Sequence, residues 1–321
     1  MPPTQILTRP QRMRRKIRQI WGHDNFGHIL TMAAGAAILI ITGVIFYELF
    51  AQSSLSRHAF GLNFLFTKVW DPVAGIFGAL PFIYGTVVTS ILALLMAVPL
   101  GLGSAIFLAE LAPPRLSDTL SFLTELLAAV PSVIYGLLGI FVLIPVLHTS
   151  IIPLLKNWFG FLPIFGGDFF GVSYLTAGVV LSIMIVPFIV SVSREVLLAV
   201  PQDQREASLA LGGTHWQTTW RVVVPFAMKG ILGSIFLALA RALGETMAVT
   251  MVIGNNPQIK ASLLAPGYSI AAIIANEFTE AVGNLYLSSL IELGLVLFIL
   301  TIVINGLARL LILATARRAS R

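Results

Sequence analysis

The sequence contains no cysteine and little charge. None of its 321 residues is cysteine, which excludes a disulfide framework, a thiolate metal site and a cysteine nucleophile. Only 11% of the residues are charged and 57% are hydrophobic, whereas soluble domains carry about 25% charged residues. A chain this poor in charge cannot cover a water-facing surface. Most of its surface must therefore face lipid or other apolar protein.

Nucleotide and metal sites are also missing from the sequence. No lysine follows a glycine, so the Gly-Lys-Ser/Thr loop that holds nucleotide phosphates is absent. No histidines or aspartates cluster at metal-ligand spacing, and we expect no cofactor. The formal charge of +6 does not indicate a nucleic-acid partner, because the basic residues flank apolar runs. That placement encodes orientation in a membrane and predicts lipid as the surrounding medium.

Six apolar stretches are long enough to cross a bilayer, which requires about 20 residues per helix. The sequence therefore predicts an all-α membrane protein with six transmembrane helices. Pro99 in the second stretch and Pro131 in the third are candidate kinks. The predicted spans are 29–50, 80–108, 120–147, 172–191, 226–253 and 285–308.

The basic residues predict the orientation of these spans. Six arginines and lysines precede the first acidic residue, Asp24, and such a cluster stays in the cytoplasm. Both termini are then cytoplasmic. Fifteen of the twenty Lys and Arg lie inside, counting Lys229 at the inner edge of the fifth span, four lie outside and Arg241 lies within a span. A signal peptide is the alternative interpretation of the first span, but its apolar run exceeds the ~7–15 residues of a signal core.

This orientation divides the chain into functional segments. Aromatic residues in the first outer segment suit a membrane interface. The predicted segments are a cytoplasmic basic N-terminal segment (1–28), the first span (29–50), a periplasmic interfacial segment (51–79), a five-helix transport core (80–308) and a cytoplasmic basic tail (309–321).

The longest polar inner segment, residues 194–225, predicts a helix–turn–helix. Pro201 begins a short helix, Gly212 and Gly213 end it, and Thr214 caps a second helix that runs to Pro225. The surface of the first helix mixes small residues, Ala207 and Ala210, with the charges of Arg205 and Glu206, which suits docking into the groove of a partner. The alternative is a plain connector, although connectors are usually shorter.

The fifth span contains a charged pair, Arg241 and Glu245. An arginine near mid-bilayer costs at least ~2.5–3.5 kcal/mol, so it must face protein or a hydrated path. Four residues of helical spacing place Glu245 on the same face. Either the two side chains satisfy each other and hold the bundle together, or Arg241 presents its planar fork to a passing oxyanion while Glu245 orients it.

The inner loop resembles the loop shared by the permease subunits of ABC importers. Glu206-Ala207-Ser208, three residues, Gly212, nine residues, Val222 and then Val224-Pro225 matches the family pattern, with conservative departures at positions 208, 222 and 224. In that family the loop forms the coupling helix that docks on the ATPase subunit. The resemblance implies that Glu206, Ala207 and Gly212, with the adjacent Arg205, belong to that contact. It also implies a MetI-like fold.

Other motifs resemble the PstC-type permeases of bacterial phosphate importers. They are Gly78-Ala79-Leu80-Pro81 leading to Gly85-Thr86, Pro131-Ser132-Val133-Ile134-Tyr135-Gly136, and Ala240 to Thr250 followed by Val252 to Asn255. The resemblance implies that Arg241 and Glu245 take part in the passage of inorganic phosphate. Ser132, Tyr135 and Thr246 are weaker candidates for the same path, because hydroxyls in spans more often bond neighbouring helices.

The resemblance also implies partners. They are a PstA-like second permease, a PstB-like ATPase dimer and a PstS-like periplasmic phosphate-binding protein. The chain itself is then a transport subunit of the bacterial inner membrane and not an enzyme. The alternative is an ion-coupled secondary transporter of an anion. Such transporters usually contain internal repeats, and the sequence shows no visible repeat. A membrane enzyme acting on phosphate esters is a further alternative, but it would need paired acid and base groups at one depth.

Overall fold

The computed structural model describes the backbone of residues 9–319, so the first eight residues and the last two, which belong to the predicted basic ends, lie outside the described residues. The chain forms two units, Met1–Ala51 and Gln52–Arg321. The first unit contains most of helix α1 (Arg9–Gln52). Within α1, Gly27–Gln52 is long and apolar enough to cross a membrane, and it includes the predicted first span.

The second unit is helical throughout its described residues apart from loops and one isolated bridge between Asp71 and Ile76. Its helices, with η marking π- and 3₁₀-helices, are α2 (Ser54–Phe60), α3 (Asn63–Phe66), α4 (Leu80–Ile106), η1 (Phe107–Leu111), α5 (Pro114–Ala128), α6 (Ser132–Leu138), η2 (Gly139–Leu143), α7 (Ile144–Val146), η3 (Leu147–Ile151), α8 (Ile152–Phe159), η4 (Pro163–Phe165), α9 (Tyr174–Leu198), α10 (Gln202–Ala210), α11 (His215–Thr218), η5 (Thr219–Val223), α12 (Val224–Leu243), α13 (Met247–Ile253), α14 (Ile270–Glu277) and α15 (Asn284–Ala319).

Six helical segments of the described chain are long and apolar enough to span a bilayer, as predicted. The third differs from the prediction: it runs over Ser132–Phe159 and not over 120–147. Pro131 does not kink a continuous helix but separates α5 from α6, because proline has no backbone N–H and pushes the residue before it out of the α region. Pro99, by contrast, lies inside the uninterrupted α4.

Helices α4 and α9 form the centre of the second unit. Small residues recur every four positions along α4, at Ala93, Ala97, Gly101 and Ala105, and all four are buried. A Cβ added at Gly101 would lie 2.8 Å from the side chain of Ile189 on α9. Close approach through small residues is how helices associate in a membrane, where lipid competes with every apolar contact.

The segment between α1 and α4 differs in part from the predicted interfacial belt. Phe64 and Phe77 are buried, at 0% and 2% exposure, and pack with Phe82 and Tyr268, whereas Phe66 is exposed. These aromatic rings therefore form a small core of their own and do not all lie along the membrane surface.

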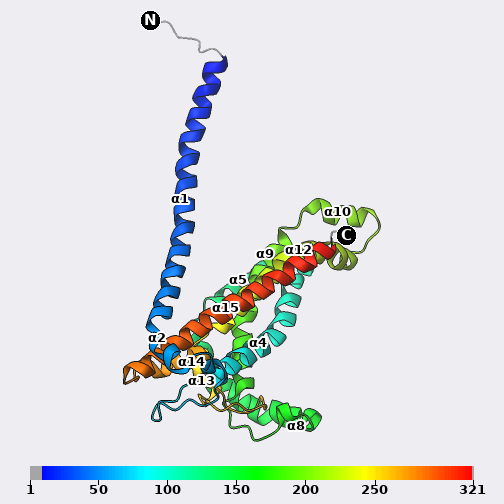
Figure 1. The fold of residues 1–321 in the computed structure, drawn as a ribbon. Coiled ribbons are helices and arrows are strands. Elements are labelled where there is room, and N and C mark those ends of the chain that lie inside the picture. The colour runs from blue at the N-terminus through cyan, green and yellow to red at the C-terminus, as the bar shows by residue number, and fades with distance from the viewer. Residues whose placement is uncertain (1–8, 320–321) are drawn as a thin grey trace. The chain divides into compact units, whose positions relative to one another are not determined.

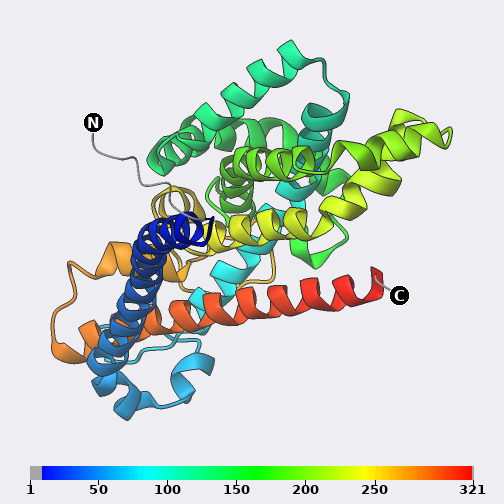
Figure 2. The ribbon, with the colours of Figure 1, turned by 90° about the horizontal axis from the view of Figure 1, so that it is seen from above.

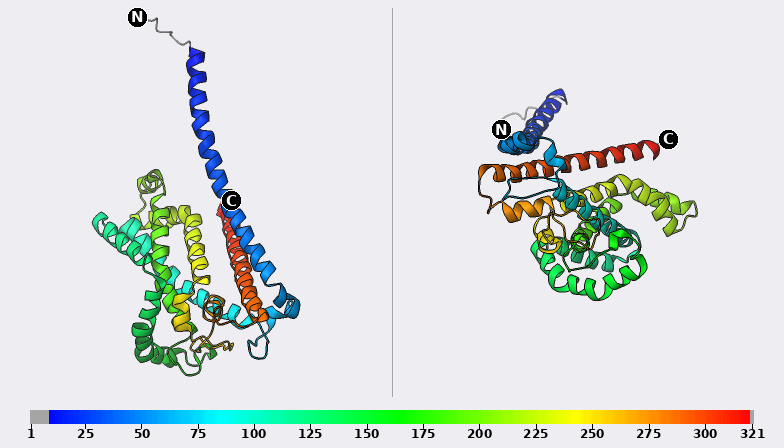
Figure 3. Two further views of the ribbon diagram at one scale, coloured as in Figure 1. Left: turned by 90° about the vertical axis from the view of Figure 1, so that its left-hand side faces the viewer. Right: turned by 60° about the horizontal axis from the view of Figure 1, so that its bottom comes forward.

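The second unit has two ends of different character (Figure 1 and, turned about the vertical axis, the left view of Figure 3). The turn from α10 to α11 projects from one end, and α8, α13 and α14 gather towards the other. Seen from above in Figure 2, α12 and α15 run side by side. Helix α12 therefore leads directly from the projecting loop towards the opposite end.

Candidate transport and coupling sites

The predicted fifth span is broken at its charged pair. Helix α12 ends at Leu243, Gly244 to Thr246 form a short break, and α13 begins at Met247. The prediction that Glu245 lies one helical turn beyond Arg241 on the same face is therefore wrong. Gly244 has the poorest helix propensity after proline, and it occupies the end of α12.

Arg241 is the third residue from the end of α12, beside the break and not in the middle of a continuous helix. Its side chain is partly exposed, and its guanidinium carbon lies 5.9 Å from the ring centre of Phe188 on α9. Within the described part of the chain, Arg241 forms no ion pair and its side chain donates no hydrogen bond. The structure thus leaves the donors of this cation available and does not seal it among helices.

Glu245 has a partner of a different kind. Its Oε1 accepts the backbone N–H of Ala248 at 3.2 Å, in the first turn of α13. A carboxylate at a helix start satisfies an otherwise unpaired N–H group and interacts well with the helix dipole. Glu245 therefore stabilises the restart of the helix and does not neutralise Arg241 through a direct contact, so the interpretation of a mutually satisfied pair does not hold.

The hydroxyl candidates surround this break unequally. Tyr135 is buried in one packed cluster with Ala242 and Ala248, on either side of the break, and its hydroxyl donates to the carbonyl oxygen of Leu127 at 2.7 Å. The Thr246 hydroxyl contacts the Gly244 carbonyl only weakly, at 3.4 Å. Tyr135 thus already uses its proton within the chain, whereas Thr246 keeps its donor nearly free.

Ser132 approaches the break through the packing of α6 on α13. A Cβ at Gly136 would lie 2.5 Å from the sulfur of Met251 and 3.3 Å from Ala248, so the two backbones almost touch. Ser132 lies one turn before Gly136, and residues one turn apart share a helix face. A Cβ at Gly139, directly after α6, would lie 2.7 Å from Val252, so the two helices run parallel and Ser132 lies towards the start of α13.

Sequence reasoning missed Phe188 at this site. An aromatic residue in an apolar span carries no signal of its own, because its position beside Arg241 depends on how α9 packs against α12. The Gly254-Asn255 motif, by contrast, has the residue types that commonly end a helix. Gly254 has φ +98°, Asn255 has φ +50°, and the Asn255 side chain donates to the Thr250 carbonyl at 3.0 Å. The pair ends α13 in the manner of a glycine C-cap.

The inner loop has the predicted helix–turn–helix form at its first half. Helix α10 begins directly after Pro201, and Gly212 ends it with φ +86°, a conformation that glycine adopts without strain. Thr214 caps α11 by a reciprocal pair of hydrogen bonds with Gln217. The second helix does not stop at Pro225, however: it continues through η5 into α12.

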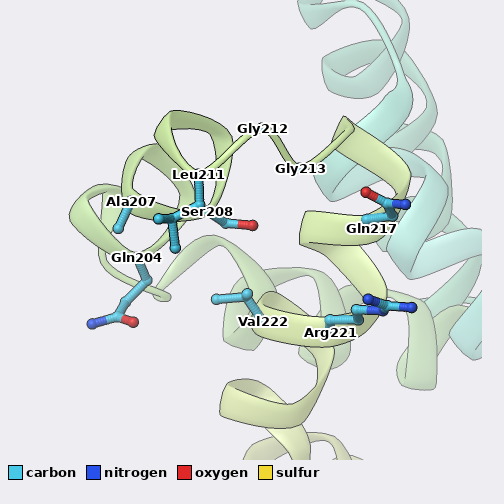
Figure 4. A pocket seen from close by; sticks show the side chains of 9 residues that line it. All are labelled: Gln204, Ala207, Ser208, Leu211, Gly212, Gly213, Gln217, Arg221 and Val222. Carbon is cyan, nitrogen blue, oxygen red and sulfur yellow. The ribbon is translucent and has the colours of Figure 1, made fainter.

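Glu206, Ala207 and Gly212 are all exposed on this loop. The inner curve of the turn holds an open groove of about 430 Å³. Figure 4 shows this groove between α10 on one side and α11 with η5 on the other. Its lining residues are Gln204, Ala207, Ser208, Leu211, Gly212, Gly213, Gln217, Arg221 and Val222.

Apolar side chains are also exposed on this loop. Leu211 is 90% exposed at its tip, and Trp216 and Trp220 are 58% and 45% exposed. Exposed apolar groups beside polar ones are typical of surfaces that bind another protein.

Arg205 differs from its neighbours on α10. Its side chain is 15% exposed and points back to Glu110 of η1, with 2.8 Å between Nη2 and Oε1. Glu110 is thus a packing partner near the C-terminal end of the second span, Leu80–Leu111.

The match to a family model covers residues 97–318, and that model is described as binding-protein-dependent transport system inner membrane component. Curated relatives cover nearly the whole chain. The phosphate transport system permease protein PstC of Mesorhizobium japonicum is 48% identical, over 90% of each chain. The proteins of the same name are 45% identical in Haemophilus influenzae, over 93% of this chain and 96% of that one, and 44% in Xylella fastidiosa, over 92% of each.

A solved structure shows the same fold. The MetNI methionine ABC transporter in an inward-facing conformation is 18% identical with a TM-score of 0.53, and the match covers 77% of this chain and 99% of that one. The predicted fold class, a MetI-like helical membrane protein, is therefore confirmed. With this fold, the family match over most of the chain and relatives at 44–48% identity, the chain belongs to the binding-protein-dependent transport inner membrane components, and among them to the PstC permeases.

Proposed function

We propose that this chain is the permease subunit of an ATP-driven importer that moves inorganic phosphate across the bacterial inner membrane. The observation that carries the proposal is the Arg241 guanidinium, which has no anionic partner among the described residues although it borders apolar helices. An unpaired cation in an apolar setting is stabilised most by a passing anion, because the electrostatic attraction is strong where the dielectric constant is low. The relatives at 44–48% identity are named as phosphate transport permeases.

The break between α12 and α13 supports a transient phosphate site. A guanidinium can donate two parallel hydrogen bonds to one phosphate, which a point charge cannot. Thr246 adds a nearly free hydroxyl beside it, and Ser132 and Tyr135 border the same region. The Glu245 carboxylate next to this site repels an anion, which favours release over tight retention, as transport requires.

The proposed partners follow from what this chain lacks and exposes. It has no nucleotide-binding loop, so a PstB-like ATPase dimer would hydrolyse ATP and dock on Glu206, Ala207 and Gly212. Arg205 lies on the same helix, but its side chain points into the chain. A PstA-like permease would complete the path and a PstS-like binding protein would deliver phosphate from outside. Both chain ends would then lie in the cytoplasm.

Reconstituted uptake tests this function. The chain is placed in lipid vesicles with its candidate permease, ATPase and binding-protein partners, and labelled phosphate is followed with and without ATP. We expect uptake only when the ATPase and ATP are present. Uptake by this chain without any ATPase would identify a secondary transporter and overturn the proposal.

Substitution of Arg241 tests the site. Arg241→Ala should lower uptake by about a hundredfold or more, since two charge-assisted hydrogen bonds are each worth about 1.5–3 kcal/mol. Arg241→Lys should retain part of the uptake, because it keeps the charge but not the planar fork. Lys229→Ala is the matched control, since it removes an exposed cation from the same helix. Normal uptake by an assembled Arg241→Ala complex would show that the residue is structural.

A further inference from the structure

The most extensively bonded side chain at the inner end of the described structure is Arg205 of α10. Its Nη2 lies 2.8 Å from Oε1 of Glu110, and its Nε lies 3.4 Å from Oε2 of the same carboxylate. Both side chains are largely buried, at 15% and 10% exposure. The two side chains form a bidentate ion pair between α10 and η1, which directly follows α4.

The same guanidinium also holds the end of α9. It donates to the carbonyl oxygen of Leu197 at 2.9 Å and to that of Val200. Carbonyls at a helix C-terminus lack partners within the helix, and a cation placed there also favours the helix dipole. One side chain thus connects three elements: α10, the end of α9 and the end of α4.

Helix α10 is fixed on its other side as well. The hydroxyls of Ser208 and Thr218 lie 2.9 Å apart and join α10 to α11. The loop therefore has rigid attachments both to the helices that precede it and to α12, which it leads into.

We infer that the Arg205–Glu110 pair transmits the movement of the loop helix to α4 and α9, so that ATPase action moves these two helices together. This inference rests on the proposed function. It makes Arg205 and Glu110 positioning residues that act within this chain, and it assigns direct contact with the ATPase to the exposed side chains of α10 instead. Packed elements joined by a buried ionic pair move as one body, because separating the charges would leave each one unpaired in an apolar setting.

Coupling, not assembly, is the quantity that tests this inference. The variants are Glu110→Gln, Arg205→Gln and the two combined, in the complete reconstituted complex. Glu195→Gln is the control, because Glu195 also pairs with an arginine at the inner end but is 68% exposed. Phosphate uptake, ATP hydrolysis and retention of the ATPase are measured on each.

We expect each single variant to keep the ATPase bound and hydrolysing while uptake per ATP falls by about 2- to 30-fold, the range of coupling mutations. The combined variant should be no worse than the single ones, because the residues act as a pair. Loss of the ATPase from Arg205→Gln but not from Glu110→Gln would identify Arg205 as a direct contact and overturn the inference. Unchanged uptake per ATP would also overturn it.

A covalent bridge between positions 110 and 205 tests whether the variants fail because this connection is lost or because the fold is damaged. The chain has no cysteine, so Glu110→Cys with Arg205→Cys introduces the only thiols of this subunit. Bridging them with a short bifunctional thiol reagent should restore uptake per ATP, and a bridge that forms without restoring it would contradict the inference. A wild-type complex that takes up no phosphate would instead contradict the proposed function.

Discussion

Glu245 joins two functions in one side chain: it caps α13 and places negative charge beside the proposed phosphate site. These functions can be separated. Glu245→Gln keeps an oxygen that accepts the Ala248 N–H but removes the charge. The local field should then hold phosphate more tightly, so the maximal uptake rate and KM should both fall, by about two- to fivefold for an effect of about 0.3–1 kcal/mol.

Glu245→Ala removes both functions and serves as the comparison. Loss of the cap should lower the free energy of unfolding by about 1 kcal/mol, which a thermal unfolding curve of the purified complex can detect. The Glu245→Gln variant should have the same free energy of unfolding as the wild type. If the two variants shift stability equally, the hydrogen bond to Ala248 does not stabilise the helix restart.

At the residue scale, the sequence predicted which side chains bear charge but not how they are partnered. Arg241 was identifiable because an arginine in an apolar run needs a reason. Its relation to Glu245 was predicted from helical spacing, and a single glycine between them makes that spacing invalid. Arg205 shows the same limit: its charge was evident, but its direction depends on Glu110, which is 95 residues away in sequence.

The helices themselves were predictable where local signals decide them. Pro201, Gly212 and Thr214 delimit α10 and α11 through backbone conformation and capping, which act within a few residues. The third span was misplaced because Pro131, predicted to kink one continuous helix, instead separates α5 from α6. The second loop helix was expected to end at Pro225, yet the chain stays helical through it. The π-helix η5 directly precedes Pro225, and such a local π adjustment accommodates the missing N–H of a proline within a span.

The contact between α4 and the loop before α14 depends on glycine. A Cβ at Gly85 would lie 2.0 Å from the backbone oxygen of Tyr268. The next residue, Thr86, accepts the N–H of Ile270 at 2.9 Å. Burial raises the pKa of Tyr268 to about 12, although a hydrogen bond from Asn276 opposes the rise. The Gly-Thr motif seen in the sequence therefore has a structural explanation as a closely packed, hydrogen-bonded junction.

Gly85→Ala should accordingly destabilise the protein by about 1–3 kcal/mol, the cost of overpacking a close contact. Gly103→Ala on the same helix is the control, because a Cβ there would meet nothing within 4 Å, and alanine favours the helix by about 0.5–1 kcal/mol. Unfolding in detergent, followed by circular dichroism, measures both. Equal stability of the two variants would show that the junction is not close-packed.

For the whole molecule, the arrangement of α12 links the two sites. It begins just after the exposed inner loop and ends at Leu243, two residues past Arg241 and directly before the break. The Arg205–Glu110 pair gives the same loop a second connection, to α4 and α9. The loop is therefore connected both to α12, which carries Arg241, and to α9. Helix α9 carries Phe188, and the Arg241 guanidinium lies over the Phe188 ring.

The orientation of the molecule is testable because the chain has no cysteine. Val73→Cys and Leu211→Cys place single thiols at positions that are 99% and 90% exposed, so only their side of the membrane should decide their labelling. A membrane-impermeant maleimide should label position 73 in right-side-out vesicles and position 211 only in inverted ones. Labelling of both from the same side would contradict the predicted topology.

The same thiol reports docking of the ATPase. If Leu211 lies in the contact, addition of the ATPase subunit to inverted vesicles should slow the labelling of Leu211→Cys, because a buried thiol is reached only when the complex opens. Asp118→Cys provides the matched control, since the Asp118 side chain is 79% exposed and is reached from the same side in the predicted topology. Slower labelling at both positions would indicate general shielding, whereas unchanged labelling at position 211 would place the contact elsewhere on the loop.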